Sequence, residues 1–361
     1  MKSERNVQRL PLRILGLMSG TSLDGLDLCL ATFDKDSSGC WRFDMLASQT
    51  LPYSSSWAQK LQLAHTLNAF DFVALHKDYG RFLGEQAAGF LRGKSVRADY
   101  VASHGHTIFH QPQRGVTFQL GDGAALAAAA GVPVISDFRS LDVALGGQGA
   151  PLVPIGDRLL FSGYDSCLNL GGFANISFEQ GGQRTAFDVC PCNVVLNAQS
   201  RLLGEPYDRD GALAAQGKVS SPLLDELNAL DFYAQRGAKS LGREWVEEVF
   251  SEKMAAHGVS VHDKLRTLCE HIAMQIAQSV PSRQGGTLLV TGGGAFNAFL
   301  VQRIAANISC RVVVPEATIV NFKEALIFAF LGALYAVNEV NTLASATGAR
   351  RSSIGGSLTK A

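Results

Sequence analysis

Apolar runs and three- to four-residue apolar repeats alternate along the chain, and each pattern predicts a different kind of element. Residues 12–17 and 26–33 are nearly continuous apolar runs, which is typical of buried strands, and residues 41–50 can pair beside them. The chain is therefore expected to open with an antiparallel meander. A helix follows over residues 72–83, where apolar side chains recur at steps of three and four.

The next elements alternate between strand and helix. Residues 100–103 are predicted as a strand, residues 124–130 as a helix that ends at Gly131, and residues 132–136 as another strand. Strands that alternate with helices in this way indicate α/β units.

The middle of the chain repeats the opening pattern. Strands are predicted at residues 166–170, 175–179 and 185–188, and the turns between them contain paired glycines. Each half thus begins with a hairpin whose first turn is rich in Gly, Ser or Thr, which indicates duplication of pattern without identity. The later predictions are helices at 194–203, 245–257 and 264–279, a strand at 287–291, a helix from Phe296, a strand at 311–314 and an apolar helix at 322–337.

Composition narrows the class of protein. A chain of 361 residues is long enough for two domains, and 32 basic against 32 acidic residues give no net charge. This balance argues against a protein that clamps nucleic-acid phosphates and against a polybasic membrane binder. The longest apolar run, 325–337, is shorter than the roughly 20 residues that span a bilayer. Seven irregularly spaced cysteines and a polar opening segment predict a cytoplasmic protein.

Three glycine-rich turns are candidate phosphate sites. The first, Gly20-Thr21-Ser22-Leu23-Asp24-Gly25-Leu26-Asp27, offers backbone N–H groups, two hydroxyls and two carboxylates, a combination that suits a nucleotide phosphate with Mg²⁺. It lacks the Gly-Lys-Ser/Thr ending of a Walker A loop, and the strand that follows it excludes a dinucleotide fingerprint. An ordinary structural hairpin is the alternative.

The second turn contains Gly171 and Gly172, and the third is Thr291-Gly292-Gly293-Gly294-Ala295-Phe296-Asn297, between a strand and a helix, where a nucleotide can rest against the helix N-terminus. Each turn alone is a weak signal. Three turns in the order hairpin, hairpin, strand-to-helix indicate two lobes that close on a nucleotide.

Several polar residues are candidates for chemistry. Asp188 is predicted at the end of a strand, where it suits a general base, with a helix cap as the alternative. His104, His106 and His110 can be interpreted as a zinc site, although a loop histidine near the substrate is favoured. Glu324 is an unusual charge in the apolar last helix, and it is either a solvated helix-start carboxylate or a group that contacts substrate.

The longest motifs resemble one family, the 1,6-anhydro-N-acetylmuramic acid kinases. The motifs are Met18-Ser-Gly-Thr-Ser-Leu-Asp-Gly-Leu-Asp27, Val134-Ile-Ser-Asp-Phe-Arg-Ser-Leu-Asp142, Gly146-Gly-Gln-Gly-Ala-Pro-Leu-Val-Pro154, Asn169-Leu-Gly-Gly-Phe-Ala-Asn-Ile-Ser177, Thr291-Gly-Gly-Gly-Ala-Phe-Asn297 and the ending Ala346-Thr-Gly-Ala349. The resemblance covers nearly the whole chain. It implies an actin- and hexokinase-like (ribonuclease H-like) α/β fold with two lobes and with ATP and Mg²⁺ in a cleft between them.

The resemblance also implies a reaction and a set of site residues. Water attacks the anomeric carbon of the anhydro sugar, and the freed 6-oxygen accepts the γ-phosphoryl group, giving N-acetylmuramic acid 6-phosphate and ADP in cell-wall recycling. Carried over by position, the implied residues are Asp188 as base; Gly20, Thr21, Ser22, Leu23, Asp24, Gly25, Leu26, Asp27, Gly171, Gly172, Thr291, Gly292, Gly293, Gly294 and Asn297 at ATP; and His104, Arg139 and Glu324 on the sugar side.

The chain departs from the family pattern next to the base. Val189, Cys190 and Cys192 stand where Thr, Gly and Gly are common, Asn197 stands for a common Asp, and His106 replaces a usual Gln. Loss of two glycines makes positive φ or a close backbone approach less available. We hypothesise that the two thiols make the activity sensitive to oxidation.

The expected organisation is an N-terminal lobe of residues 1–135 with 340–361 and a C-terminal lobe of residues 136–339, in a homodimer. The Gly- and Pro-rich stretch 145–155 is the best candidate for a linker, with a surface loop as the alternative. Three other interpretations stay open: a kinase for a different sugar, a nucleotide-driven binding protein on the same fold, and an inactive relative of the kinases.

Overall fold

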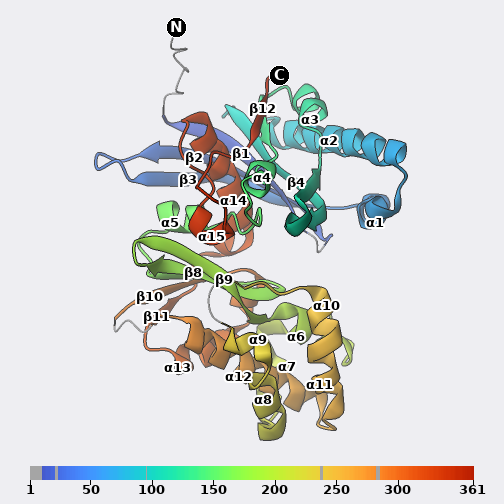
Figure 1. The fold of residues 1–361 in the computed structure, drawn as a ribbon, viewed down its shortest axis with the longest axis vertical. Coiled ribbons are helices and arrows are strands. Elements are labelled where there is room, and N and C mark those ends of the chain that lie inside the picture. Colours follow the sequence, from blue (N-terminus) through green and yellow to red (C-terminus); the bar gives the residue numbers. More distant parts are fainter. Residues whose placement is uncertain (1–9, 21–22, 95, 236–238, 282–284) are drawn as a thin grey trace. The chain divides into compact units, whose positions relative to one another are not determined.

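The computed structural model describes residues 10–20, 23–94, 96–235, 239–281 and 285–361 (Figure 1). The chain forms two compact units, unit 1 from Met1–Leu160 with Phe322–Ala361, and unit 2 from Phe161–Asn321. Unit 1 therefore extends beyond residue 135, and the stretch 145–155 lies inside it. One contact that holds this stretch in unit 1 is a hydrogen bond of 2.8 Å from the Gln148 N–H to the Thr347 carbonyl oxygen.

Unit 1 is built on a mixed sheet. Three antiparallel strands, β1 (Leu12–Ser19), β2 (Gly25–Lys35) and β3 (Trp41–Pro52), form the expected meander, which is confirmed. Strands β4 (Tyr100–Gln111) and β6 (Val134–Ser136) continue the sheet in parallel with β1. The order is β12-β6-β4-β1-β2-β3, with β5 (Val116–Leu120) paired to β4 and β12 (Ser357–Thr359) at the edge.

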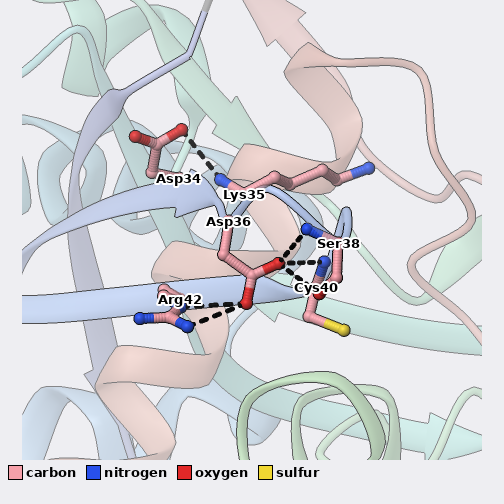
Figure 2. A network of polar contacts seen from close by, with 6 residues as sticks. All are labelled: Asp34, Lys35, Asp36, Ser38, Cys40 and Arg42. Carbon is pink, nitrogen blue, oxygen red and sulfur yellow. Dashed lines mark hydrogen bonds and ion pairs between the residues drawn. The ribbon is translucent and has the colours of Figure 1, made fainter.

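The β2–β3 hairpin turns through a polar network that centres on Asp36 (Figure 2). Its Oδ1 accepts hydrogen bonds from the N–H groups of Ser38 and Cys40 at 2.9 and 3.0 Å, and its Oδ2 accepts one from Arg42 at 3.0 Å. These donors, the Ser38 hydroxyl first, lower the pKa of Asp36 to about 2. The carboxylate thus replaces the ladder bonds that the turn leaves unmade.

Helices cover both faces of this sheet. On one face, α2 (Ala69–Leu91) and α3 (Gly123–Ala130) pack over alternate side chains that include Leu15 and Leu17. The other face contacts α14 (Ala317–Ala336), where a Cβ on Gly16 would lie 2.9 Å from the backbone nitrogen of Ala329. Glycine at this position therefore allows the helix to press directly against β1.

Helix α14 is also the one helix, within the described part of the chain, that is long and apolar enough to cross a membrane. Its most apolar stretch is 72% buried inside the protein, as expected for a core helix. At its first turns, the Lys323 ammonium lies 2.7 Å from the Asp157 carboxylate of α5 (Pro154–Leu160), and both side chains are buried. The remaining helical segments of unit 1 are α1 (Ser55–Leu63), η1 (Ala64–Thr66), η2 (Pro112–Arg114), α4 (Ser140–Ala144) and α15 (Ala344–Thr347).

Unit 2 repeats the strand order of unit 1. The antiparallel strands β7 (Ser166–Leu170), β8 (Phe173–Gln180) and β9 (Gln183–Pro191) are followed by β10 (Thr287–Thr291) and β11 (Arg311–Val313) in parallel, in the order β11-β10-β7-β8-β9. Three antiparallel strands joined to two parallel ones thus occur in both units. This duplication confirms the α/β class and the repeated pattern expected for the two halves of the chain.

Helix α12 (Val261–Ser279) forms the core of unit 2. Its Leu268, Ile272 and Ile276 are fully buried against the apolar sheet residues, and Ser260 caps its first turn by accepting a hydrogen bond from the Asp263 N–H. The other helical segments are α6 (Asn193–Arg201), η3 (Arg209–Gly211), α7 (Ala212–Gln216), α8 (Ser221–Asn228), α9 (Asp231–Ala234), α10 (Arg243–Trp245), a π-helical turn (Val246–Phe250), α11 (Ser251–Ala256), η5 (Gly293–Phe296) and α13 (Ala298–Asn307).

Candidate active site

The first glycine-rich turn connects β1 to β2 in unit 1. Thr21 and Ser22 lie outside the described residues. Leu23 follows with φ of +61°, a left-handed conformation that a leucine adopts only where the surroundings impose it. Gly25 is packed against β3, because a Cβ there would lie 2.7 Å from the Leu51 carbonyl oxygen, and Leu26 is buried in the core. Among the described residues of this turn, the groups available to a ligand are thus backbone groups and two carboxylates.

The two carboxylates of this turn differ in their surroundings. Asp27 is half-buried on β2 and accepts a hydrogen bond of 2.5 Å from the Thr50 hydroxyl. Burial raises its pKa, and the exposed Asp24 carboxylate adds to the rise. Within the described ranges, no group of three His, Cys, Asp or Glu side chains is placed to hold a metal ion. Two carboxylates without a third ligand suit a hydrated Mg²⁺ whose other ligands are water and phosphate.

Two of the three predicted sugar-side residues form a hydrogen-bonded pair in unit 1. The Nε and Nη2 of Arg139 donate to His104 Nε2 at 3.1 and 2.8 Å, and Arg139 Nη1 donates to the Gly149 carbonyl oxygen at 2.6 Å. His104 Nδ1 in turn donates to the Gly105 carbonyl oxygen at 2.9 Å. Burial and the guanidinium hold the pKa of His104 well below its usual range, so the ring is neutral and accepts from the arginine.

Glu324, the third sugar-side residue, interacts electrostatically with Arg139. Its side chain is exposed, yet partial desolvation raises its pKa, opposed by Arg139 and reinforced by Asp27. The interpretation as a helix-start carboxylate is wrong, because α14 begins at Ala317 and Glu324 lies two turns inside it. The structure therefore brings His104, Arg139 and Glu324 together.

The interpretation of three histidines as a zinc site is not supported by their geometry. From Leu17 to Ser19 on β1 the paired residues on β4 run from Ser103 to His106, so β4 carries one extra residue, a β-bulge. As a result of the bulge, the His104 ring lies against Phe328 of α14, with 4.6 Å between the ring centroids. The His106 ring faces Tyr79 of α2, with 6.4 Å between the ring centroids. The two histidines thus lie on opposite faces of the sheet.

The second glycine-rich turn lies against the start of α6 in unit 2. The Gly171 carbonyl accepts from the Asn193 N–H at 3.1 Å, and the Gly172 carbonyl accepts from the N–H groups of Cys192 and Val194 at 2.9 and 3.2 Å. These bonds satisfy the first donors of the helix, as a cap does. The turn therefore fixes where α6 begins, and no Cβ would be obstructed at Gly172.

The glycines of the third turn differ in what they do. Gly292 has φ of +80°, and a Cβ there would lie 2.5 Å from Asn169 Oδ1, while a Cβ on Gly294 would lie 2.7 Å from the Leu170 Cβ. Both are thus required for packing against β7. Gly293 has open space around it. Thr291 is buried, with its hydroxyl directed to the Leu168 carbonyl oxygen at 3.4 Å.

Beside this turn, unit 2 contains a pocket of about 490 Å³. Gly293, Gly294 and Asn297, three of the residues that the family resemblance assigned to ATP, line it, and Asn297 also caps α13 by accepting from the Leu300 N–H at 2.9 Å. The other lining residues were not predicted: Asn193, Leu196, Asn197, Tyr207, Asp208, Arg209, Asp210, Phe296 and Asn321.

A short irregular segment supplies one wall of that pocket. Asp208 accepts hydrogen bonds from the N–H groups of Leu213 and Ala214 at 2.8 and 3.0 Å, which caps α7. Asp210 has φ of +57°, and Gly211 follows at +74°. Successive left-handed residues reverse the chain and leave Tyr207 48% exposed at the pocket. The run Asp208-Arg-Asp-Gly211 is the turn signal that could have pointed to it.

Asp188, the predicted base, lies on β9 of unit 2. The strand does not end there as expected, because β8–β9 pairing continues past a bulge at Val189 to Pro191. Asp188 Oδ2 accepts a hydrogen bond of 2.9 Å from the Leu241 N–H, and its own N–H donates to the Lys239 carbonyl at 2.9 Å. Burial raises the pKa of the carboxyl, opposed by the Leu241 N–H. A raised pKa makes a better base.

The two cysteines beside the base are shielded from solvent. Cys190 and Cys192 are both fully buried, and burial raises the pKa of Cys192 to about 12 and that of Cys190 well above its usual range. Cys192 has φ of −129°, and Cys190 is not among the residues with positive φ. The replacement of glycine at these positions thus brings no left-handed strain, and the thiols lack the thiolate form that oxidation needs.

Comparison with known proteins identifies the family. The model of the family described as Anhydro-N-acetylmuramic acid kinase matches residues 12–361. The chain belongs to this family. A curated anhydro-N-acetylmuramic acid kinase from Pseudomonas paraeruginosa is 41% identical over 316 residues, 81% of this chain and 83% of that protein. Those from Vibrio cholerae and Pseudomonas fluorescens are 34% and 38% identical, over 93% and 88% of this chain and 95% and 91% of their own lengths.

Membership of the anhydro-N-acetylmuramic acid kinase family confirms the resemblance drawn from the motifs and makes the chain a kinase by family. Among solved structures, an activator of the 2-hydroxyisocaproyl-CoA dehydratase from Clostridium difficile aligns over 91% of this chain and 95% of its own at 13% identity, with a TM-score of 0.43. That likeness is distant and adds nothing to the strand orders described above.

Proposed function

We propose that this kinase hydrolyses the anhydro bond of 1,6-anhydro-N-acetylmuramic acid and transfers the γ-phosphoryl group of ATP to the freed 6-oxygen. The products are N-acetylmuramic acid 6-phosphate and ADP, in cytoplasmic recycling of peptidoglycan. The observation that carries the proposal is a half-buried carboxyl with raised pKa, Asp188, in a chain of this family. The family expectation of a homodimer belongs to the same proposal, and light scattering tests it.

In the first step Asp188 acts as general base. The Leu241 N–H occupies Oδ2, which orients the carboxylate and leaves Oδ1 for a water molecule. Oδ1 takes a proton from that water while the water oxygen forms a bond to the anomeric carbon. The bond between the anomeric carbon and the 6-oxygen breaks at the same time. The 6-oxygen then bonds to the γ-phosphorus, and ADP leaves with the electron pair of the broken phosphoanhydride bond.

The nucleoside of ATP is assigned to the 490 Å³ pocket of unit 2. Tyr207 and Phe296 line it and are 48% and 44% exposed, which is unusual for large aromatic rings and suits stacking on a planar base. The amides of Asn197 and Asn321 offer both donors and acceptors to a base or ribose.

The phosphates are assigned to the glycine-rich turns, and Mg²⁺ to the carboxylates of Asp24 and Asp27. The Asp24 carboxylate contributes to the raised pKa of Asp27, so the two acids are near enough that both would bind one hydrated cation. When bound, Mg²⁺ offsets phosphate charge, and the backbone N–H groups of the turns orient the oxygens.

The sugar is assigned to Arg139, with Glu324 beside it. Arg139 is fixed by the hydrogen bonds that it donates to His104 and to the Gly149 carbonyl oxygen, and burial lowers its pKa only to about 10, so the guanidinium stays charged at neutral pH. A fixed, partly desolvated guanidinium suits a carboxylate or ring hydroxyls, which an N-acetylmuramic acid carries.

The test is ADP release in a coupled assay with ATP and Mg²⁺, with and without 1,6-anhydro-N-acetylmuramic acid, followed by mass analysis of the sugar. The proposal expects sugar-dependent ADP and a product heavier by one water and one phosphoryl group. Phosphorylation without the gain of water would contradict the hydrolytic step. No sugar-dependent ADP from a protein that binds ATP would contradict the proposal.

A kinase for a different anhydro sugar is the second candidate. Val189, Cys190 and Cys192 favour it, because they alter the segment that follows the base. Parallel assays with anhydro sugars that lack the lactyl group decide between the two by comparing kcat/KM.

A further inference from the structure

Three segments that are far apart in the sequence meet at one buried carboxylate in unit 1. Asp142, on α4, has no exposed surface. Its Oδ1 accepts a hydrogen bond of 2.7 Å from the Thr347 hydroxyl of α15, and its Oδ2 accepts one of 2.8 Å from the Gly149 N–H. Each of these residues belongs to a different one of the motifs on which the family resemblance rests. The proposed function uses neither Asp142 nor Thr347.

The Gly149 peptide connects this carboxylate to Arg139. Its N–H donates to Asp142, and its carbonyl oxygen accepts a hydrogen bond of 2.6 Å from Arg139 Nη1. Gly149 has φ of +67°, and a Cβ there would lie 2.7 Å from Val143 Cγ2, so a larger residue would strain this position. The guanidinium is thus held at Nη1 by a peptide that Asp142 fixes, and at Nε and Nη2 by His104.

The rest of the loop 145–149 is bound to the same two residues. The Gly147 N–H donates to the Asp142 carbonyl oxygen at 2.9 Å, and the Gln148 N–H donates to the Thr347 carbonyl oxygen at 2.8 Å. A satisfied buried network fixes the groups that it joins, because any displacement leaves a buried donor or acceptor without a partner. The loop that carries the Gly149 carbonyl therefore cannot move without breaking several of these bonds.

Asp142 also interacts with Arg139 through its charge. Burial lowers the pKa of Arg139 to about 10, and the charges of Glu324 and Asp142 oppose that fall. A charge that is taken out of water is tolerated where an opposite charge and hydrogen bonds compensate it. Asp142 thus stabilises both the charge and the position of the guanidinium.

We propose that Asp142 and Thr347 are positioning residues for Arg139, which they hold in the orientation that binds the sugar. Asp142 acts through the Gly149 peptide, and Thr347 acts by fixing the Asp142 carboxylate. Both side chains are buried, at 0% and 1% exposed, so they act on a ligand only through Arg139. The inference rests on the proposed function for the assignment of the sugar to Arg139.

The test compares two substitutions of one residue. Thr347→Val removes the hydroxyl and nearly keeps the size of the side chain, whereas Thr347→Ser keeps the hydroxyl. We expect Thr347→Val to raise the Kd for 1,6-anhydro-N-acetylmuramic acid, measured calorimetrically without nucleotide, about 5- to 10-fold, the scale of one buried hydrogen bond. Thr347→Ser is expected to stay within about twofold of the unsubstituted protein, because its hydroxyl can still donate to Asp142.

Thr342→Val is the matched control. Thr342 lies in the same C-terminal segment and is also 1% exposed, but its hydroxyl donates to Asn341 Oδ1 at 3.3 Å. The same chemical change is therefore expected to leave the Kd for the sugar unchanged. Asp142→Asn, which nearly keeps the shape and removes the charge, is the second test variant and is expected to raise this Kd in the same way. Thermal unfolding shows which variants fold, and Asp142→Asn decides if Thr347→Val does not.

Hydrogen exchange over residues 145–149 separates this inference from the proposed function, because it needs no ligand. Faster exchange in Thr347→Val, but not in Thr347→Ser or Thr342→Val, supports the network. It does so even if the unsubstituted protein neither binds nor converts the sugar, a result that contradicts the proposed function alone. Unchanged exchange in both Thr347→Val and Asp142→Asn overturns the inference.

Binding of the sugar gives the second decision. If the unsubstituted protein binds it, an unchanged Kd in both Thr347→Val and Asp142→Asn overturns the inference. An equal rise of the Kd in Thr342→Val also overturns it, because that result indicates a general structural role. A rise that is confined to Thr347→Val and Asp142→Asn supports it.

Discussion

The two units share a strand order but fix their first hairpin turns by different means. In unit 1 the turn starts from Ser19, which side chains of His106 and Tyr53 hold in place, and two carboxylates follow it. In unit 2 the corresponding turn, Gly171 and Gly172, is fixed by its own carbonyl groups, which accept from the first N–H groups of α6. The two units thus share the backbone arrangement of the hairpin, whereas the side chains around the turn differ between the units and determine what each turn can bind.

Both units carry a β-bulge where the candidate chemistry lies. In unit 1 the bulge on β4 separates His104 from His106, and in unit 2 the bulge at Val189 follows Asp188. Bulges re-aim side chains that regular alternation would place elsewhere. The comparison therefore predicts that unit 2 supplies the base and that unit 1 supplies Arg139 for the sugar.

Asp188→Asn tests the base with the largest expected effect. The amide cannot take a proton, so kcat should fall at least ~10²-fold, while ADP binding and thermal unfolding stay close to those of the unsubstituted protein. Steady-state kinetics with the anhydro sugar measure the change. Near-normal turnover would contradict the assignment of Asp188 as the general base.

Arg139→Met tests the sugar side of unit 1. Loss of the charged donors should raise the KM for the sugar about 10- to 100-fold, the scale of one or two charged hydrogen bonds, with little change in the KM for ATP. Arg114→Met is the control, because Arg114 is exposed and bonds Gln111. An equal rise for ATP would contradict the assignment of Arg139 to the sugar.

The pH profile tests the environment of Asp188. Because burial raises its pKa above 3.8, and because the base acts as carboxylate, kcat should be full above the raised pKa and fall up to about tenfold per unit below it. The acid limb should therefore lie above pH 3.8. Rates between pH 4 and 8 measure it, and a limb that persists in Asp188→Asn would belong to another group.

A matched pair of glycine substitutions tests what each turn of unit 2 requires. Gly292→Ala should destabilise unit 2 by roughly 1–3 kcal/mol, because φ is +80° and the new Cβ would meet Asn169 and Leu170. Gly172→Ala has open space and should change stability far less. Urea unfolding compares them, and equal losses would contradict the division of roles among these glycines.

Oxidation is expected to have the smallest effect. The hypothesis of oxidation sensitivity predicted loss of activity, but burial of Cys190 and Cys192 predicts that brief treatment with peroxide leaves turnover unchanged. Mass analysis after labelling of the native protein with a thiol reagent should find Cys40, which is exposed, and neither buried thiol. If peroxide lowers the activity and a reductant restores it, the prediction from burial is contradicted and the hypothesis of oxidation sensitivity is supported.

The strands and long helices were predictable because their signals are local. Continuous apolar runs bounded by glycine mark β1, β7 and β10, and a three- to four-residue period marks α2. The expected helix over residues 245–257 is interrupted by a π-helical turn at Val246–Phe250, for which the sequence carries no signal that we can identify.

The geometry of the site was less predictable because bulges and left-handed turns break the period on which the predictions rest. The spacing of His104 and His106 places them on one face of a regular strand, and only the extra residue near Gly105 separates them. The pocket wall at Tyr207 lies in an irregular segment between short helices, where no apolar period exists. The segment packs against α7, which follows it directly, and against α13, which is distant in sequence and therefore carries no local signal.

Unit 1 is built from two segments that are separated in the sequence by the whole of unit 2, and this has a consequence for folding during synthesis. Unit 2 is one continuous segment, so its core is complete when Asn321 leaves the ribosome. Unit 1 must wait for Phe322–Ala361, because Gly332 of α14 packs on Ala102 and β12 pairs with β6 only at the end of the chain. Until then the apolar face around Ile14 lacks its cover, and this interval is when the nascent protein most needs a chaperone.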